Sequence, residues 1–273
     1  MTPLVNLLAL ALVLAVGSPA MAASAGQAVA RGAARALAGK EALRGALTSQ
    51  TAKAGASRAL TAAERRAYAR LLRELDQATL SGIERRFGEH ILASRLHQAR
   101  QTPTVFLSHE PYQARLTAVY PQLSAAQRQK ILGDFRNRPF VDRSNPLLPR
   151  TVAHERLHEL ADPRFRATLG SRLDEGATAH LASKISNDLG IQHLTRPYVA
   201  ERRIVEMIEA RVGERALARA YFRGEIEPLR QAVDAQLGRG ALDSVARLTV
   251  KGRFLAAEEI LKHGLRSRSH IGG

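Results

Sequence analysis

The chain has 273 residues, of which 45% are hydrophobic and 24% are charged, and it contains no cysteine. This composition is typical of a globular protein with a sizeable core, and the missing cysteine excludes disulfides, thiolate metal sites and cysteine nucleophiles. The net charge is +16, yet basic residues are spread among acidic ones and aromatic residues are only 4%, which predicts no specific nucleic-acid partner.

The first 22 residues have the pattern of a secretory signal peptide. Residues 4–16 form an apolar run interrupted only at Asn6, and the small residues Ala20 and Ala22 fit a signal peptidase site after Ala22. A retained anchor helix is the alternative, but such a helix ordinarily needs about twenty apolar residues. We therefore expect an exported protein, periplasmic or secreted, with no stable membrane span after cleavage.

Residues 23–60 are rich in alanine, glycine, serine and isolated basic residues, which predicts a low-complexity leader or linker. Whether this segment is a removable propeptide stays open. Residues 61–273 are expected to form the folded domain. Its first predicted elements are a helix opened by the capping box Thr61–Glu64, a helix over 83–100, strands within 102–109 and 139–141, and a helix over 124–135.

The most informative pattern is His-Glu-Arg-Leu-His at residues 154–158, inside the apolar stretch TVAHERLHEL. On an α-helix, His154 and His158 project from one face one turn apart, so both imidazoles can bind a single cation. Zinc favours neutral imidazole nitrogens, and a catalytic zinc takes three protein ligands and leaves a fourth position for water. The pattern predicts a zinc site that needs one more ligand. The alternative is a pair of core histidines hydrogen-bonded to carbonyl groups.

Glu175 is the candidate third ligand, in the segment SRLDEGATAHLASKI, which predicts a second amphipathic helix. Asp162-Pro163 is expected to end the first helix, because proline restricts its predecessor and lacks the amide hydrogen that a continuing helix needs. Ser171 or Asp174 is placed to cap the second helix, which could then bring Glu175 to the histidines. The alternative for Glu175 is a purely structural role, since helix dipoles favour acidic residues in the first turn.

Together, HERLH and the downstream DEGATAHLA resemble the active site of gluzincin-type zinc metallopeptidases, over roughly residues 149–190. In that family a glutamate on the helix after HExxH is the third zinc ligand. The resemblance implies that His154, His158 and Glu175 bind Zn²⁺ and that Glu155 is the general base for the metal-bound water. It also implies a mainly α, zincin-like α+β fold, with a small β-sheet beside the active-site helix pair.

Metal-assisted hydrolysis usually needs a donor for the charge that develops on the carbonyl oxygen. Tyr198 is the candidate for this catalytic role, with His180, His193 and Arg196 as alternatives, and an ordinary core tyrosine is its other interpretation. His180 lies five positions beyond Glu175 and is expected off the ligand face. Three carboxylates could orient a ligand histidine, namely Asp174, Glu159 and Asp162, and the alternative for each is a solvated charge at a helix end.

The remaining chain predicts a C-terminal helical bundle. Glycines recur where its helical patterns stop, as expected for left-handed helix ends. The predicted helices are residues 199–211, 214–222, 226–237 and 241–263. The stretch 213–238 also resembles helices that follow the glutamate ligand in some gluzincin relatives.

The sequence thus leads to the hypothesis of an exported zinc-dependent metallopeptidase that acts on proteins or peptides through metal-activated water. A secreted effector or toxin with the same chemistry is one alternative. A nonenzymatic, cationic anion-binding protein with structural histidines is another, and its binding would weaken steeply as salt rises. Substrate sequence and oligomeric state stay open.

Overall fold

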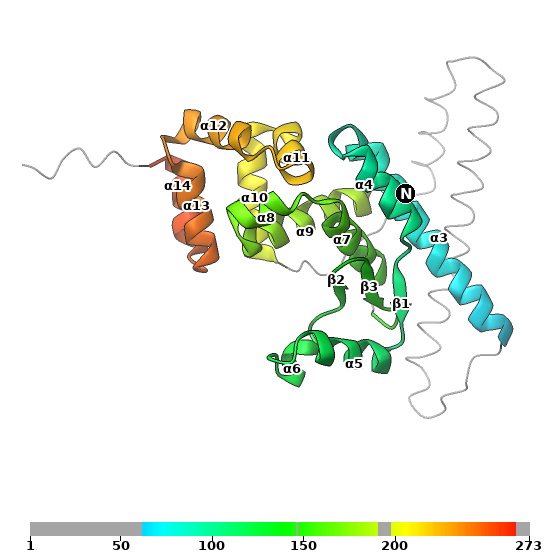
Figure 1. Ribbon diagram of the computed structural model, residues 1–273. Coiled ribbons are helices and arrows are strands. Elements are labelled where there is room, and N and C mark those ends of the chain that lie inside the picture. Colours follow the sequence, from blue (N-terminus) through cyan, green and yellow to red (C-terminus); the bar gives the residue numbers. More distant parts are fainter. Residues whose placement is uncertain (1–61, 146, 191–197, 266–273) are drawn as a thin grey trace, which may run out of the picture. The chain divides into compact units, whose positions relative to one another are not determined.

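The computed structural model describes residues 62–145, 147–190 and 198–265 (Figure 1). The predicted signal peptide (1–22) and leader (23–60) lie outside these ranges, as does the capping residue Thr61. The pattern of residue contacts divides the chain into two compact units, with the boundary between Leu71 and Leu72. The packing described below is that of residues 72–265.

The described residues are mainly helical, as the sequence predicts, with twelve α-helices and one three-stranded sheet. None of these helices combines the length and apolarity that crossing a bilayer requires. The helices are α3 (Ala62–Phe87), α4 (Ala93–Gln101), α5 (His109–Val119), α6 (Ala125–Arg128), α7 (Leu148–Leu160), α8 (Pro163–Leu169), α9 (Ser171–Asp188), α10 (Val199–Val212), α11 (Glu214–Arg223), α12 (Ile226–Leu237), α13 (Ala241–Val250) and α14 (Phe254–His263), with a short 3-10 helix η1 (Gly88–His90).

The sheet consists of β1 (Val105–Leu107), β2 (Gly133–Phe135) and β3 (Pro139–Asp142), in the order β1-β3-β2. β1 runs parallel to β3, whereas β2 runs antiparallel to it and pairs Gly133 with Val141. All four residues of β3 are buried, as expected for a central strand covered on its faces. Helix α7 packs against β2 and β3, so the sheet lies beside the helix that carries both histidines (Figure 1).

Helices α7 and α9 pack against each other and share the main hydrophobic core with the C-terminal helices. Leu157 and Leu160 of α7 and Leu181 and Ile185 of α9 are fully buried. Burial of a leucine or isoleucine side chain contributes about 1.5–3 kcal/mol, so this shared core fixes the helix pair firmly. The predicted active-site helix pair, small sheet and C-terminal helices are therefore all present.

The prediction of one helix over residues 124–135 is wrong. Only α6 is helical, opened by a capping box in which Ser124 and Gln127 each accept a hydrogen bond from the other's backbone amide, at 3.2 and 2.8 Å. The chain then extends into β2, where buried Asp134 accepts hydrogen bonds from Arg115 and Tyr120. Pairing with β3 and these side-chain bonds override the local helix propensity.

Two other long helices are interrupted. The predicted helix over 83–100 is divided, because α3 ends at Phe87 and α4 begins only at Ala93 after η1. The predicted helix over 241–263 is split into α13 and α14, with Gly252 between them at φ +71°. Glycine adopts this left-handed conformation without the strain that a side chain would cause. Gly213, Gly224 and Gly238, which were predicted as helix ends, all have positive φ.

The turn between α7 and α9 also differs in detail from the prediction. Asp162-Pro163 ends α7 as expected, but Asp162 then accepts a hydrogen bond from the Arg164 amide and opens the short helix α8, which was not predicted. Helix α9 follows Gly170 directly and has no side-chain cap. The prediction that Ser171 or Asp174 caps α9 is therefore wrong, since both residues lie inside the helix.

Arg156 lies on the face of α7 opposite the histidines and anchors the helix to the neighbouring segments. Its guanidinium is 2% exposed and donates to Asp76 of α3 at 2.8 Å and to the Thr102 carbonyl at 2.8 Å. It also donates to the Ala99 carbonyl and to Glu159. This network fixes the position of α7 relative to the segment that leads into β1.

We expect Arg156→Ala to lower the free energy of unfolding by about 3–5 kcal/mol, because it leaves the carboxylate of Asp76 buried without its charge partner. Urea denaturation of the full chain measures this loss. Arg100→Ala is the control, since Arg100 pairs with Glu84 at the surface, where such a pair contributes about 0–1 kcal/mol. Equal losses in both variants would contradict the anchoring role of Arg156.

Candidate metal centre

The two histidines of the motif lie on one face of α7, as their spacing predicts. Pro149 lies in the first turn of α7, where a missing amide hydrogen costs nothing, and the helix runs without a break to Leu160. His154 and His158 are therefore one turn apart, and their rings meet edge to face with centroids 4.7 Å apart. Both side chains are largely buried, with 12% and 11% of their surface exposed.

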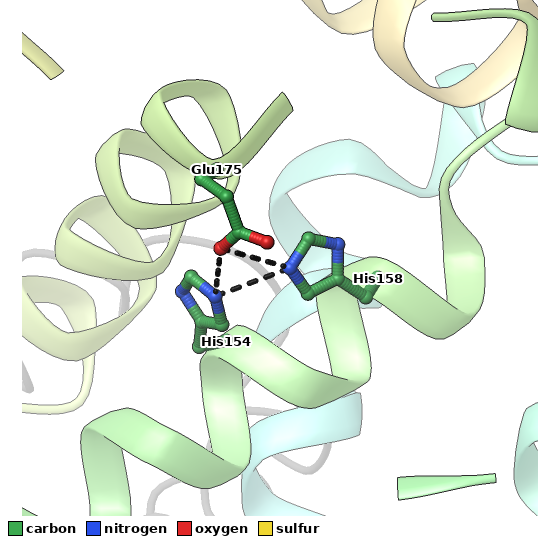
Figure 2. Close-up of side chains that lie close together, drawn as sticks. All are labelled: His154, His158 and Glu175. Carbon is green, nitrogen blue, oxygen red and sulfur yellow. Dashed lines mark hydrogen bonds and ion pairs between the residues drawn. The ribbon is translucent and has the colours of Figure 1, made fainter. Parts of the chain in front are cut away.

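Glu175 reaches the histidines from the first turns of α9 (Figure 2). Its Oε2 atom lies 3.1 Å from Nε2 of His154 and 3.5 Å from Nε2 of His158. The two Nε2 atoms are 3.1 Å apart. All three predicted ligands thus direct one ligand atom toward a common point, and within the described residues they form the single group of this kind.

These spacings fit a zinc ion. Ligand atoms arranged tetrahedrally at the ~2.0–2.1 Å typical of zinc bonds would be about 3.3 Å from one another, and the three separations here are 3.1, 3.1 and 3.5 Å. A point equidistant from atoms so spaced lies about 1.9 Å from each in their plane, and a small displacement out of the plane reaches zinc bond lengths. Two imidazoles and one carboxylate are also a donor set that zinc favours.

The protonation states of His154, His158 and Glu175 depend on one another. Burial lowers the pKa of His154. Burial also acts to lower the pKa of His158, but the hydrogen bond and charge of Glu175 outweigh it and raise that pKa to about 9. Burial would raise the pKa of Glu175, yet its bonds to both histidines hold it well below the ordinary value. The carboxylate is therefore ionised and available as a ligand, and a bound cation would displace a proton from the cluster.

Glu155 is buried beside the cluster, against the first residue of β2. Burial raises its pKa to about 8, opposed by the charge of His158 and assisted by that of Glu175. A Cβ atom at Gly133 would lie 2.4 Å from Oε1 of Glu155, so the absence of a side chain at Gly133 makes room for this carboxylate. No side chain among the described residues hydrogen-bonds to Glu155, which leaves it available to act on a water.

Tyr198 also lies at the cluster, at the start of α10. Its ring stacks on His154 with centroids 5.7 Å apart and an interplanar angle of 8°. Its exposed fraction is 41%, so the interpretation as an ordinary core tyrosine is wrong. Its backbone is left-handed, with φ +54°, a strained conformation for a bulky residue that often marks functional sites. Desolvation and the charge of Glu175 raise the pKa of the phenol, which keeps it a hydrogen-bond donor.

The candidate supporting carboxylates and the alternative oxyanion donors differ in their distance from the cluster. Asp174 alone among the three supporting carboxylates approaches a ligand, with Oδ2 3.6 Å from Nδ1 of His158. Glu159 binds Arg156, and Asp162 binds Arg95 and Arg164. His180 pairs with Glu209 of α10, away from the ligand face as expected. His193 and Arg196 lie outside the described residues.

Three residues at the site were not predicted from the sequence: Gly133, Thr178 and Tyr221. Thr178 follows Glu175 by three positions, a spacing that places it near the ligand face of α9 and could have been recognised. Gly133 and Tyr221 carry no such signal, because they reach the site from β2 and α11 through tertiary packing.

Comparisons with protein families, with curated proteins and with solved structures give no match to this chain.

Proposed function

We propose that this chain is an exported zinc-dependent peptidase that hydrolyses peptide bonds in proteins or peptides. The observation that carries the proposal is the convergence of His154, His158 and Glu175, whose ligand atoms all lie within 4.8 Å of one another. Core histidines that are merely satisfied need only carbonyl partners, whereas these two share one carboxylate oxygen and face each other. Export rests on the signal-peptide pattern of residues 1–22.

A bound zinc would lower the pKa of a coordinated water to about 7 and polarise the carbonyl of the substrate. Glu155 accepts a proton from the attacking water, whose oxygen forms a bond to the carbonyl carbon. The same carboxyl then gives that proton to the amide nitrogen as the carbon–nitrogen bond breaks, so the products are a carboxylic acid and an amine, which at neutral pH become a carboxylate and an ammonium group. Burial raises the pKa of Glu155 to about 8 in the metal-free chain, and the positive charge of a bound zinc would lower it, so that the carboxylate could accept the proton near neutral pH.

Tyr198 supplies the donor for the developing oxyanion. Its phenol stays protonated, and its exposed ring beside His154 places it at the accessible side of the cluster. A preorganised donor at such a position typically contributes about 10²–10³-fold to turnover. The geometry supports Tyr198 as the oxyanion donor in place of His180, because His180 is paired with Glu209.

Metal analysis and metal removal test the proposal. We expect the purified full chain to hold one zinc ion and to cleave members of an unstructured peptide library, with cleavage sites identified by mass spectrometry. Dialysis against 1,10-phenanthroline is expected to abolish cleavage, and added zinc to restore it, because the activated water depends on the metal.

Three outcomes would contradict the proposal. The first is a metal-free protein that cleaves peptides as fast as the zinc-loaded protein. The second is a site that takes up iron in preference to zinc, because two histidines and one carboxylate also form the facial triad of non-haem iron oxygenases. The third is a chain that binds neither metal, which would show that the cluster is structural.

A further inference from the structure

The hydroxyl of Thr178 lies at the centre of a small buried network behind His158. Oγ1 of Thr178 is 2.8 Å from the carbonyl of Asp174, 2.6 Å from the hydroxyl of Tyr221 and 3.4 Å from Nδ1 of His158. Thr178 and Tyr221 are both fully buried. None of these contacts follows from the metal motif itself, and Tyr221 comes from α11.

A threonine hydroxyl has one proton to donate and two lone pairs to accept with. Thr178 donates its proton to the Asp174 carbonyl. Its two lone pairs then accept from the remaining neighbours, so the Tyr221 hydroxyl and Nδ1 of His158 are both donors. The carboxylate of Asp174, 3.6 Å from the same Nδ1, is a second acceptor and favours the same arrangement.

In the neutral imidazole, a proton on Nδ1 leaves Nε2 of His158 with a free lone pair, and Nε2 is the atom that faces His154 and Glu175. We propose that Thr178 and Tyr221 are positioning residues, which hold His158 in the tautomer and orientation that bind the metal. This inference rests on the proposed zinc site and adds to it a link between the metal and helix α11.

Tyr221 is fixed well enough to hold the network in place. Its ring packs edge to face against Phe165 at 5.3 Å and Phe222 at 4.9 Å. Its backbone carbonyl accepts a hydrogen bond from the Asp162 amide at 2.8 Å. The phenol therefore has little freedom to turn away, and Tyr221→Phe would remove the hydroxyl while keeping the packed ring.

The test is zinc affinity, measured by competition with a chromophoric zinc chelator on the full chain. Outer-shell partners of metal ligands typically change metal affinity by about 10–100-fold. We expect a loss in this range for Thr178→Val and of about tenfold for Tyr221→Phe, whereas Thr178→Ser, which keeps the hydroxyl, binds zinc like the parent. Thermal unfolding of the zinc-free proteins reports separately on the fold.

Two matched variants control for packing. Thr249→Val removes another fully buried hydroxyl, which donates to the Val245 carbonyl on its own helix. Tyr112→Phe removes a buried phenol with no hydrogen-bond partner among the described residues. Both controls are expected to keep the parent zinc affinity.

The outcomes separate this inference from the proposed function. If the parent binds zinc and both Thr178→Val and Tyr221→Phe bind it with the same affinity, the positioning roles are overturned and the proposed zinc site is not. Losses equalled by the controls overturn them as well, because packing alone would then account for the effect. If Thr178→Val does not fold, Tyr221→Phe decides. A parent that binds no zinc overturns the proposed function and this inference with it.

Discussion

Replacing Glu155 by glutamine is expected to lower peptide hydrolysis by about 10²–10⁴-fold, the range typical of a lost general acid–base residue. Glutamine has nearly the same shape as glutamate but cannot accept a proton from water. The substitution also removes a buried carboxyl whose pKa is raised to about 8, so we expect no loss of stability. Zinc is expected to stay bound, because Glu155 is not among the three converging ligands.

The measurement combines kcat/KM on a cleaved peptide with zinc content and thermal unfolding of the same preparation. Glu159→Gln is the matched control, since Glu159 is a buried glutamate of the same helix that binds Arg156 instead of facing the cluster. Its kcat/KM is expected to stay within about threefold of the parent. Parent-like turnover in Glu155→Gln would remove Glu155 as the base.

Local patterns in the sequence were sufficient to predict helices α7 and α9, which carry the three proposed ligands. The spacing of His154 and His158 sets their common face, and Asp162-Pro163 ends α7 where expected. The short β3 strand was also predicted from its apolar residues between breaks. These features depend on helix periodicity and on proline, which act over a few residues and are therefore visible in the sequence.

Elements that depend on distant partners were predicted poorly. The helical pattern of residues 124–135 gives way to β2 because Asp134 meets Arg115 and Tyr120, and because the strand pairs with β3. The turn helix α8 was missed, since Asp162 was interpreted only as a stop and not as a cap. Tertiary contacts decide such segments, and single-sequence propensities do not contain them.

The candidate site likewise combines residues that local patterns predict with residues that only tertiary contacts bring in. His154, Glu155, His158 and Glu175 could be proposed because their spacing carries the chemistry, and the structure brings all four together. The space at Gly133 and the hydroxyl of Tyr221 could not be predicted from the sequence, because they reach the site only when β2 and α11 pack beside α7 and α9. The proposed ligands can thus be recognised from local sequence patterns, whereas the residues that support them come from distant parts of the chain.

Removing one of the proposed zinc ligands is the second substitution from which we expect a large effect. His154→Ala leaves one imidazole and one carboxylate, and His154 is the ligand nearest to both of the others, at 3.1 Å. We expect zinc affinity to fall by more than the ~10–100-fold that outer-shell changes cause, so that the purified variant retains less than stoichiometric zinc. Peptide hydrolysis is expected to disappear with the metal.

His180→Ala is the control for this variant, because His180 is a buried histidine paired with a glutamate, Glu209, outside the cluster. It is expected to lose some stability and to keep its zinc. Metal analysis and calorimetric zinc titration distinguish the two variants. Zinc retained in full by His154→Ala would defeat the ligand assignment, because an α7 face with a single imidazole could not hold the ion in the geometry that the three converging atoms define.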